Sequence, residues 1–208
     1  MGRYTGPVCR LCRRAGEKLF LKGERCLSPK CGVERRASPP GEHSRRRRRV
    51  SERGVQLREK QKARQIYGIL ERQFKGYYDQ ARVQKGMTGQ NLLQLLERRL
   101  DNVVFRLGFA DSRNQARQLV THGHFKLNDE RMDIPSHLVK PGDVVLWSQS
   151  GSSSEYFKAL KENIKGKNQP AWLSLDGETM QGKVLALPQP TDMETRIEDR
   201  LIIEYYSR

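Results

Sequence analysis

The apolar residues of this chain change their spacing near residue 125. From Ala63 to Val120 they recur at steps of three and four, which is the period of an amphipathic helix. Beyond that point Phe125-Lys126-Leu127 and Met132-Asp133-Ile134 alternate between apolar and polar, as strand residues do. The change of period predicts an α+β fold: a helical domain, and a helix pair packed on a small, mostly antiparallel sheet.

Three amphipathic helices are predicted in the first part of the chain. The stripe of one runs over 63–81, and a second helix runs from about Asn91 to Leu107 with its leucines on the buried side. Gly108 can end that helix in the left-handed conformation. Ser112 and Gln115 have the spacing of an N-terminal capping box, which indicates the start of a third helix.

The rest of the chain is predicted to form turns, strands and one short helix. Asn128-Asp129 and Pro141-Gly142-Asp143 are turn sequences. The β-branched and aromatic end over 200–206 is predicted as a last strand or an extended tail. Further strands are expected at 144–147, 171–175 and 183–187, a linker at 150–154 and the short helix at 155–164.

Two thiol pairs, Cys9-x-x-Cys12 and Cys26-x4-Cys31, stand near the N-terminus with thirteen residues between them. One close pair places two sulfurs on one side of a tetrahedral ion, and a second pair closes the shell. The segment is small and polar, so a bound metal would supply its folding energy. We predict a closed structural zinc site on Cys9, Cys12, Cys26 and Cys31. An iron–sulfur cluster on the same thiolates is the alternative, and a reducing compartment disfavours disulfides.

Basic charge is concentrated in the first quarter of the chain. Residues 1–50 hold 15 Lys or Arg and 4 acids, whereas the other 158 residues hold 25 and 20. Arg45 to Arg49 form an unbroken run. Charge gathered in this way attracts polyanions and is typical of an arm that tracks phosphates. The sequence lacks a membrane-length apolar run and a signal-peptide stretch, so we expect a cytosolic protein with no membrane partner.

Arginines recur at steps of four on the second and third helices. Their planar forks suit phosphate. No acids stand four residues after Arg98, Arg113 or Arg117 to form ordinary surface pairs, which favours contact with RNA over a merely solvated helix face. Few aromatics favour folded RNA read by shape over stacked single strands. The full set predicted to contact RNA is Arg45, Arg46, Arg47, Arg48, Arg49, Arg98, Asn102, Arg106, Ser112, Arg113, Gln115, Arg117, His122, His124 and Lys126.

The segments 98–110 and 112–124 closely resemble the RNA-binding domain of the bacterial ribosomal protein S-four family. The likeness continues through 56–62, 67–74 and 88–93, and it ends with 204–208, so nearly the whole chain is covered. The two cysteine pairs look like those of the zinc-bearing form of this family. Asn128-Asp129 stands where family members often have Asn-Gly, which leaves the turn type open.

The resemblance implies a structural protein of the small ribosomal subunit that binds 16S rRNA. Members bind the 5′ domain early and nucleate assembly, contribute to translational accuracy, contact the neighbouring protein S-five and help line the path along which mRNA enters. Some repress their own operon. We expect three parts: a zinc-binding basic arm at 1–45, a helical domain at 46–97 joined by the tail 197–208, and an RNA-binding domain at 98–196.

Two other functions are less consistent with the sequence. Arg99-Leu100-Asp101 resembles the catalytic sequence of pseudouridine synthases, but here it lies inside a leucine-periodic helix without a pocket. No acid, base and pocket can be assembled, and phosphate-binding glycine motifs are missing, so we predict that the chain is not an enzyme. A zinc-containing transcription regulator would need a recognition helix and usually a dimer seam, and the sequence has no heptad seam.

Overall fold

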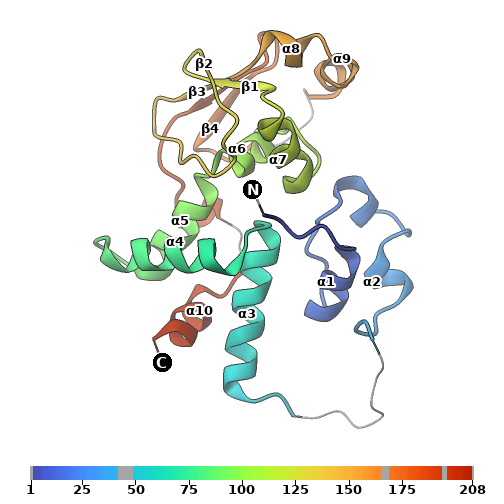
Figure 1. Ribbon diagram of the computed structural model, residues 1–208, viewed down its shortest axis with the longest axis vertical. Coiled ribbons are helices and arrows are strands. Elements are labelled where there is room, and N and C mark those ends of the chain that lie inside the picture. The colour runs from blue at the N-terminus through green and yellow to red at the C-terminus, as the bar shows by residue number, and fades with distance from the viewer. Residues whose placement is uncertain (1, 42–48, 165–168, 194–195, 208) are drawn as a thin grey trace. The chain divides into compact units, whose positions relative to one another are not determined.

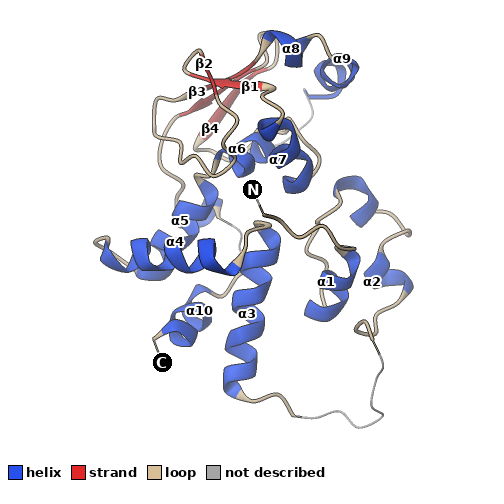
Figure 2. Ribbon diagram, in the orientation of Figure 1, coloured by secondary structure: helices blue, strands red, loops and turns tan. Residues whose placement is uncertain are grey.

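The computed structural model describes residues 2–41, 49–164, 169–193 and 196–207 (Figure 1). The chain forms two compact units: unit 1 combines Met1–Leu93 with Glu194–Arg208, and unit 2 is Gln94–Met193. Helices make up the described part of unit 1, whereas unit 2 combines helices with a sheet (Figure 2). The predicted α+β class is confirmed. Within the described ranges, no helix has the length and apolar character needed to cross a bilayer.

The N-terminal segment of unit 1 contains three short helices: α1 (Cys9–Ala15), the 3-10 helix η1 (Gly23–Cys26) and α2 (Gly32–Arg35). Its buried apolar side chains are two leucines and three thiols, namely Leu19, Leu21, Cys12, Cys26 and Cys31. A fully buried leucine contributes only about 1.5–3 kcal/mol, so this small core is a weak source of stability for the segment.

Two helices replace the single helix predicted over 63–81. α3 (Glu52–Ile66) is capped by Ser51, whose Oγ accepts a hydrogen bond from the Gly54 N–H at 3.2 Å. α4 (Glu71–Val83) follows after Gly68, which takes a φ of +63° and so ends α3. Both helices bury their apolar residues, so the apolar period continues from α3 into α4. The period of the sequence therefore could not reveal the break between them.

The C-terminal residues form helix α10 (Asp199–Tyr206), so the prediction of a strand or an extended tail is wrong. α10 packs against α3. Ile202 is fully buried, and the Tyr206 ring stacks on Tyr78 with 4.6 Å between centroids. Ile202 and Tyr206 are four residues apart and share one face of a helix. Packing of that face overrides the strand propensity of isoleucine and tyrosine.

The helix predicted from Asn91 to Leu107 is also broken, into α5 (Thr88–Glu97) and α6 (Leu100–Arg106). Backbone groups at the break between α5 and α6 form hydrogen bonds with a loop at 135–139. The Leu100 N–H donates to the His137 carbonyl at 2.8 Å, and the Arg98 carbonyl accepts from Val139 at 2.9 Å. These long-range bonds replace those that a continuous helix would make.

The described part of unit 2 contains a five-stranded antiparallel sheet in the order β2-β1-β3-β5-β4. Asn128 and Asp129 join the first two strands with φ of +50° and +69°, the geometry of a type I′ turn. The strands are β1 (Phe125–Leu127), β2 (Glu130–Arg131), β3 (Val144–Trp147), β4 (Leu173–Asp176) and β5 (Gln181–Val184). The remaining elements are α7 (Arg113–Thr121), α8 (Gln149–Ser152), α9 (Glu155–Asn163) and η3 (Pro190–Asp192).

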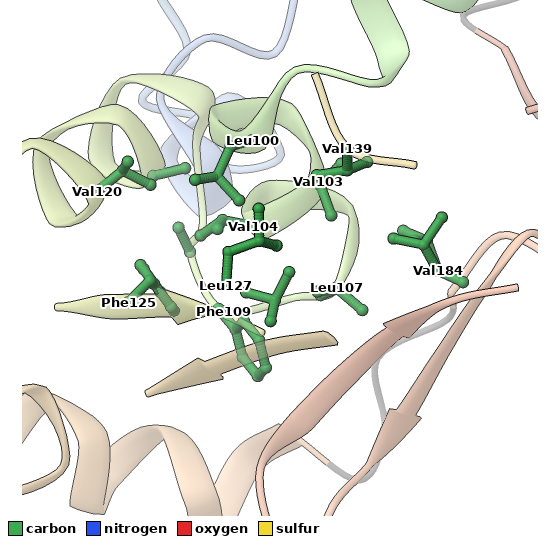
Figure 3. Close-up of a cluster of buried hydrophobic side chains, with 14 of the residues drawn as sticks. Leu100, Val103, Val104, Leu107, Phe109, Val120, Phe125, Leu127, Val139 and Val184 are labelled. Carbon is green, nitrogen blue, oxygen red and sulfur yellow. The ribbon is translucent and has the colours of Figure 1, made fainter. Parts of the chain in front are cut away.

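One apolar core holds α6 and α7 against the sheet of unit 2. Figure 3 shows side chains of α6, such as Val104 and Leu107, meeting Phe125 of β1 and Val184 of β5. Gly182 of β5 allows the closest approach, because a Cβ added there would lie 2.3 Å from Leu107 Cδ1. The helix pair is therefore fixed firmly on the sheet by close packing.

Candidate nucleic-acid interface and thiol site

The turn before α7 sets where this helix begins. Ser112 Oγ accepts a hydrogen bond from the Gln115 N–H at 3.3 Å, as the predicted cap requires. The Gln115 side chain returns to the Asp111 N–H at 2.9 Å, one residue before the N-cap that a capping box would use. Ser112 and Gln115, both predicted to contact RNA, are half-buried and engaged in this turn.

Arg117, predicted with Arg113 to contact RNA from one face of α7, is not accessible on such a face. Its side chain is buried, and its Nε and Nη2 donate to Asp101 Oδ2 at 2.9 and 2.7 Å. Arg99 also donates to this carboxylate, from Nε to Oδ1 at 3.1 Å and from Nη2 to Oδ2 at 2.8 Å. The acid lies on α6, outside the i+4 spacing considered in the sequence. One buried carboxylate thus accepts hydrogen bonds from two buried guanidinium groups.

A second buried carboxylate, Glu97 at the end of α5, organises the residues predicted at steps of four on α6. Arg106 donates to it from Nε at 3.0 Å and from Nη2 at 2.7 Å. Asn102 Nδ2 donates to Glu97 Oε2 at 2.7 Å. Asn102 is 1% exposed, so it cannot reach RNA directly, whereas the Arg106 side chain keeps 22% of its surface exposed.

Arg113 of α7 joins the same network. Its Nε donates to Asn102 Oδ1 at 2.7 Å, and its guanidinium lies over the Phe105 ring, 4.6 Å from the centroid. Arg113 is half-buried. A hydrogen bond and an aromatic face thus both contact the planar group, an arrangement that suits a guanidinium better than an ammonium group.

Arg98 lies in the break between α5 and α6. Its Nε donates to the Val139 carbonyl at 2.9 Å, which ties it to the loop at 135–139. Burial lowers the pKa of this guanidinium, and the charge of Asp143 opposes the shift. Arg98 remains half-exposed, so it combines a structural bond with a partly accessible charge.

The residues after α7 form a separate group. The His122 and His124 rings lie 6.1 Å apart, and burial together with the neighbouring His122 lowers the pKa of His124. Lys126 lies on β1 between the buried Phe125 and Leu127, so it points to the opposite face of the strand. In the arginine run, Arg49 is exposed, while Arg45, Arg46, Arg47 and Arg48 lie outside the described residues.

Sequence reasoning missed the two carboxylates that organise this surface. Glu97 and Asp101 are 0% and 3% exposed, and neither stands at a helical spacing from all the arginines it serves. Their only sequence signal is an acid inside an arginine-rich, leucine-periodic segment. Acids at such positions are almost never buried unless they are paired, which makes them candidates for partners of the arginines.

All four cysteines line one cavity of about 10 Å³, together with Lys22 and Gly32, and this is room for one water-sized sphere. They are free thiols. The Lys22 N–H donates to Cys26 Sγ at 3.3 Å. Burial raises the pKa of the Cys12 thiol, and the other three thiols raise it further.

The cavity does not present a finished coordination shell. Within the described residues, no group of three or more His, Cys, Asp or Glu side chains has an arrangement that could hold a metal ion. Four thiols are nevertheless the donor type that structural zinc sites use, and all four line one small space, with a backbone N–H directed at one sulfur.

Comparisons with known proteins cover the whole chain. The family model described as "Ribosomal protein S4/S9 N-terminal domain" matches residues 3–97, and the one described as "S4 domain" matches residues 98–145. A "Small ribosomal subunit protein uS4" from Heliobacterium modesticaldum is 55% identical over 208 residues, with all of both chains covered. Proteins of the same name are 57% identical in Syntrophomonas wolfei, over 209 residues, and 51% in Thermodesulfovibrio yellowstonii, over 208, again with full coverage.

Proposed function

Because the chain belongs to the bacterial small ribosomal subunit protein uS4 family, we propose that it is a structural rRNA-binding protein of the small ribosomal subunit in the cytoplasm. Family membership confirms the prediction that it is not an enzyme. Asp101, the acid of the sequence that resembles the catalytic motif of pseudouridine synthases, is buried and ion-paired with Arg99 and Arg117. Function therefore depends on binding and not on a reaction.

The observation that supports RNA binding most directly is the arginine pair on α6 and α7. Arg106 and Arg113 each use part of the guanidinium group on a buried partner and keep part of their surface accessible. Guanidinium groups fixed in this way present donors to phosphate with little loss of side-chain freedom on binding. The basic arm would add a second contact with RNA. Because both contacts belong to one chain, binding through one raises the effective concentration of the other near the RNA.

The finer proposal is that this protein binds 16S rRNA before other proteins do. Two linked contacts let it bind the 5′ domain alone, hold several RNA helices and so nucleate assembly of that domain. We extend the proposal to contact with S-five, a contribution to translational accuracy, a place along the path by which mRNA enters and repression of its own operon. These roles follow from the family resemblance.

Filter binding of the purified protein to protein-free 5′-domain rRNA tests the primary role. We expect binding without any other ribosomal protein, and reconstitution without this chain should block later proteins of the same domain. Unrelated structured RNA and duplex DNA of equal length serve as controls. Binding that appears only after other ribosomal proteins are added would show a late component, and preference for duplex DNA would favour a transcription regulator.

We also propose that Cys9, Cys12, Cys26 and Cys31 hold a structural zinc ion, with an iron–sulfur cluster as the alternative. The bound ion would contribute folding energy to a segment whose core holds only two leucines besides its thiols. Lys22 and Arg25 line the same cavity, and their positive charges would offset part of the negative charge that four bound thiolates bring. Elemental analysis of the purified protein distinguishes the two, and absence of both zinc and iron would refute the proposal.

A further inference from the structure

Glu97 is an unusual neighbour for cations that bind phosphate. Its side chain is completely buried, and it accepts hydrogen bonds from Arg106 Nε and Nη2 and from Asn102 Nδ2 at 2.7 to 3.0 Å. A carboxylate so close to Arg106 cancels part of the field that would attract an RNA backbone. If net charge alone determined binding, this residue would weaken it.

The same carboxylate also acts on Arg113 through one intermediate. Asn102 donates from Nδ2 to Glu97 and accepts at Oδ1 from Arg113 Nε at 2.7 Å. The contact with Glu97 fixes which side of the amide faces Arg113, because only the oxygen can accept from a guanidinium. Glu97 thus sets the orientation of an amide that in turn sets the orientation of an arginine on another helix.

We propose that Glu97 is a positioning residue for RNA recognition: it orients Arg106 directly, and Arg113 through Asn102, so that the two guanidinium groups match phosphates of a folded RNA. The proposal rests on the rRNA-binding function proposed above. Glu97 weakens the electrostatic attraction to RNA but fixes the orientation of the guanidinium groups. A guanidinium in a fixed orientation discriminates between arrangements of the RNA backbone, whereas a freely rotating charged side chain does not.

Asp101 provides a matched comparison within the same domain. It is also a buried carboxylate that accepts from two arginines, but its partners Arg99 and Arg117 are buried with it. Loss of its charge should disturb the fold without altering a group that RNA can reach. The two acids therefore separate positioning from stability.

The test compares Glu97→Gln with Asp101→Asn in the full chain, at a temperature where thermal melting shows each variant to be folded. Binding to 5′-domain rRNA and to an unrelated structured RNA is measured at several salt concentrations. For Glu97→Gln we expect about tenfold weaker binding to the 5′ domain, with unchanged or tighter binding to the unrelated RNA because a negative charge is removed. Folded Asp101→Asn should keep the wild-type ratio.

Weaker binding to the 5′ domain without weaker binding to the unrelated RNA is the signature of positioning. Tighter binding of Glu97→Gln to both RNAs would overturn the proposal in favour of a pure charge effect. If Asp101→Asn lost as much preference for the 5′ domain as Glu97→Gln, Glu97 would only stabilise the fold and would not position the arginines. If wild-type protein does not prefer the 5′ domain, the proposed function fails; if it does and Glu97→Gln retains that preference, only this inference fails.

A second variant covers the case in which Glu97→Gln does not fold. Asn102→Ser removes the link to Arg113 and leaves the Glu97–Arg106 pair in place, so a smaller loss of preference for the 5′ domain is expected. Combined with Arg113→Ala, it should add nothing further, because both changes act on the same guanidinium. Full additivity of the two losses would contradict the relay.

Discussion

Arg117 lies 16 residues after Asp101 in the chain, yet its Nε and Nη2 both reach Asp101 Oδ2, at 2.9 and 2.7 Å. Arg113 is one turn earlier on the same helix and donates instead to Asn102, beside the ring of Phe105. Both arginines therefore join α7 to α6, but Arg117 is buried whereas Arg113 remains half-exposed at the surface.

Arg117→Ala should consequently lower mainly the stability of the protein, and Arg113→Ala mainly its affinity for RNA. Arg117→Ala leaves a buried carboxylate short of one partner and should lower the free energy of unfolding by about 3–5 kcal/mol. Arg113→Ala removes the hydrogen bond to Asn102 and the contact with Phe105, so it should cost less, about 2 kcal/mol, but it should weaken binding to 5′-domain rRNA. Urea unfolding and filter binding measure the two effects. A stable Arg117→Ala with weakened RNA binding would contradict this assignment.

Replacing Arg45 to Arg49 with glutamine should weaken binding to all RNAs alike. Each lost phosphate contact removes roughly one unit or less from the slope of log affinity against log salt, so the dependence on salt should flatten. Lys158→Gln with Lys161→Gln, on the exposed face of α9, controls for bulk charge. An unchanged slope would show that the run makes no phosphate contact.

Cys26→Ser, or a strong chelator, should disorder residues 1–34 and leave unit 2 folded. The reason is that this segment has little apolar core of its own, whereas unit 2 has a separate one. Limited proteolysis mapped by mass spectrometry measures the loss locally. Leu27→Ser is the matched control, because its side chain is adjacent but 73% exposed. Protection unchanged by Cys26→Ser, or lost throughout the chain, would refute a local metal role.

The attachment of α10 should weaken in acid. Burial raises the pKa of Glu71, but hydrogen bonds from Lys60 and Tyr206 outweigh it, so the pKa falls below its ordinary value of 4.5. A lowered carboxyl pKa contributes stability that is present above pH 4.5 and is lost as the pH falls through the folded value. The urea midpoint should therefore fall more steeply below pH 4.5 in the wild type than in Glu71→Gln.

Glu155→Gln is the control for that experiment, since Glu155 makes an exposed ion pair with Lys158 on α9. Its midpoint should follow the wild-type curve. Tyr206→Phe removes the 2.8 Å hydrogen bond to Glu71 and should cost about 1 kcal/mol above pH 5. Parallel curves for wild type and Glu71→Gln would mean that Glu71 does not couple α10 to pH.

Local residue patterns were sufficient for the class of fold and for several chain reversals. The change of apolar period near residue 125 coincides with the first strand, β1, and Ser112 does cap α7. Gly108 takes the expected left-handed φ, at +81°. Asn128-Asp129 forms a two-residue hairpin turn although it lacks the usual glycine, because short polar side chains tolerate positive φ. Such features depend on neighbours in sequence and can be predicted from it.

The sequence by itself determined the helical and strand periods, the paired thiols and the concentration of charge, because each depends on residues close in the chain. Only the tertiary structure decided where the long helix breaks, since the loop at 135–139 supplies the competing hydrogen bonds. It also decided that α10 is a helix and that Arg117 is buried while Arg113 is partly exposed. A charge is buried only where a distant partner compensates its desolvation, and Asp101 and Glu97 become such partners only after the helices have packed.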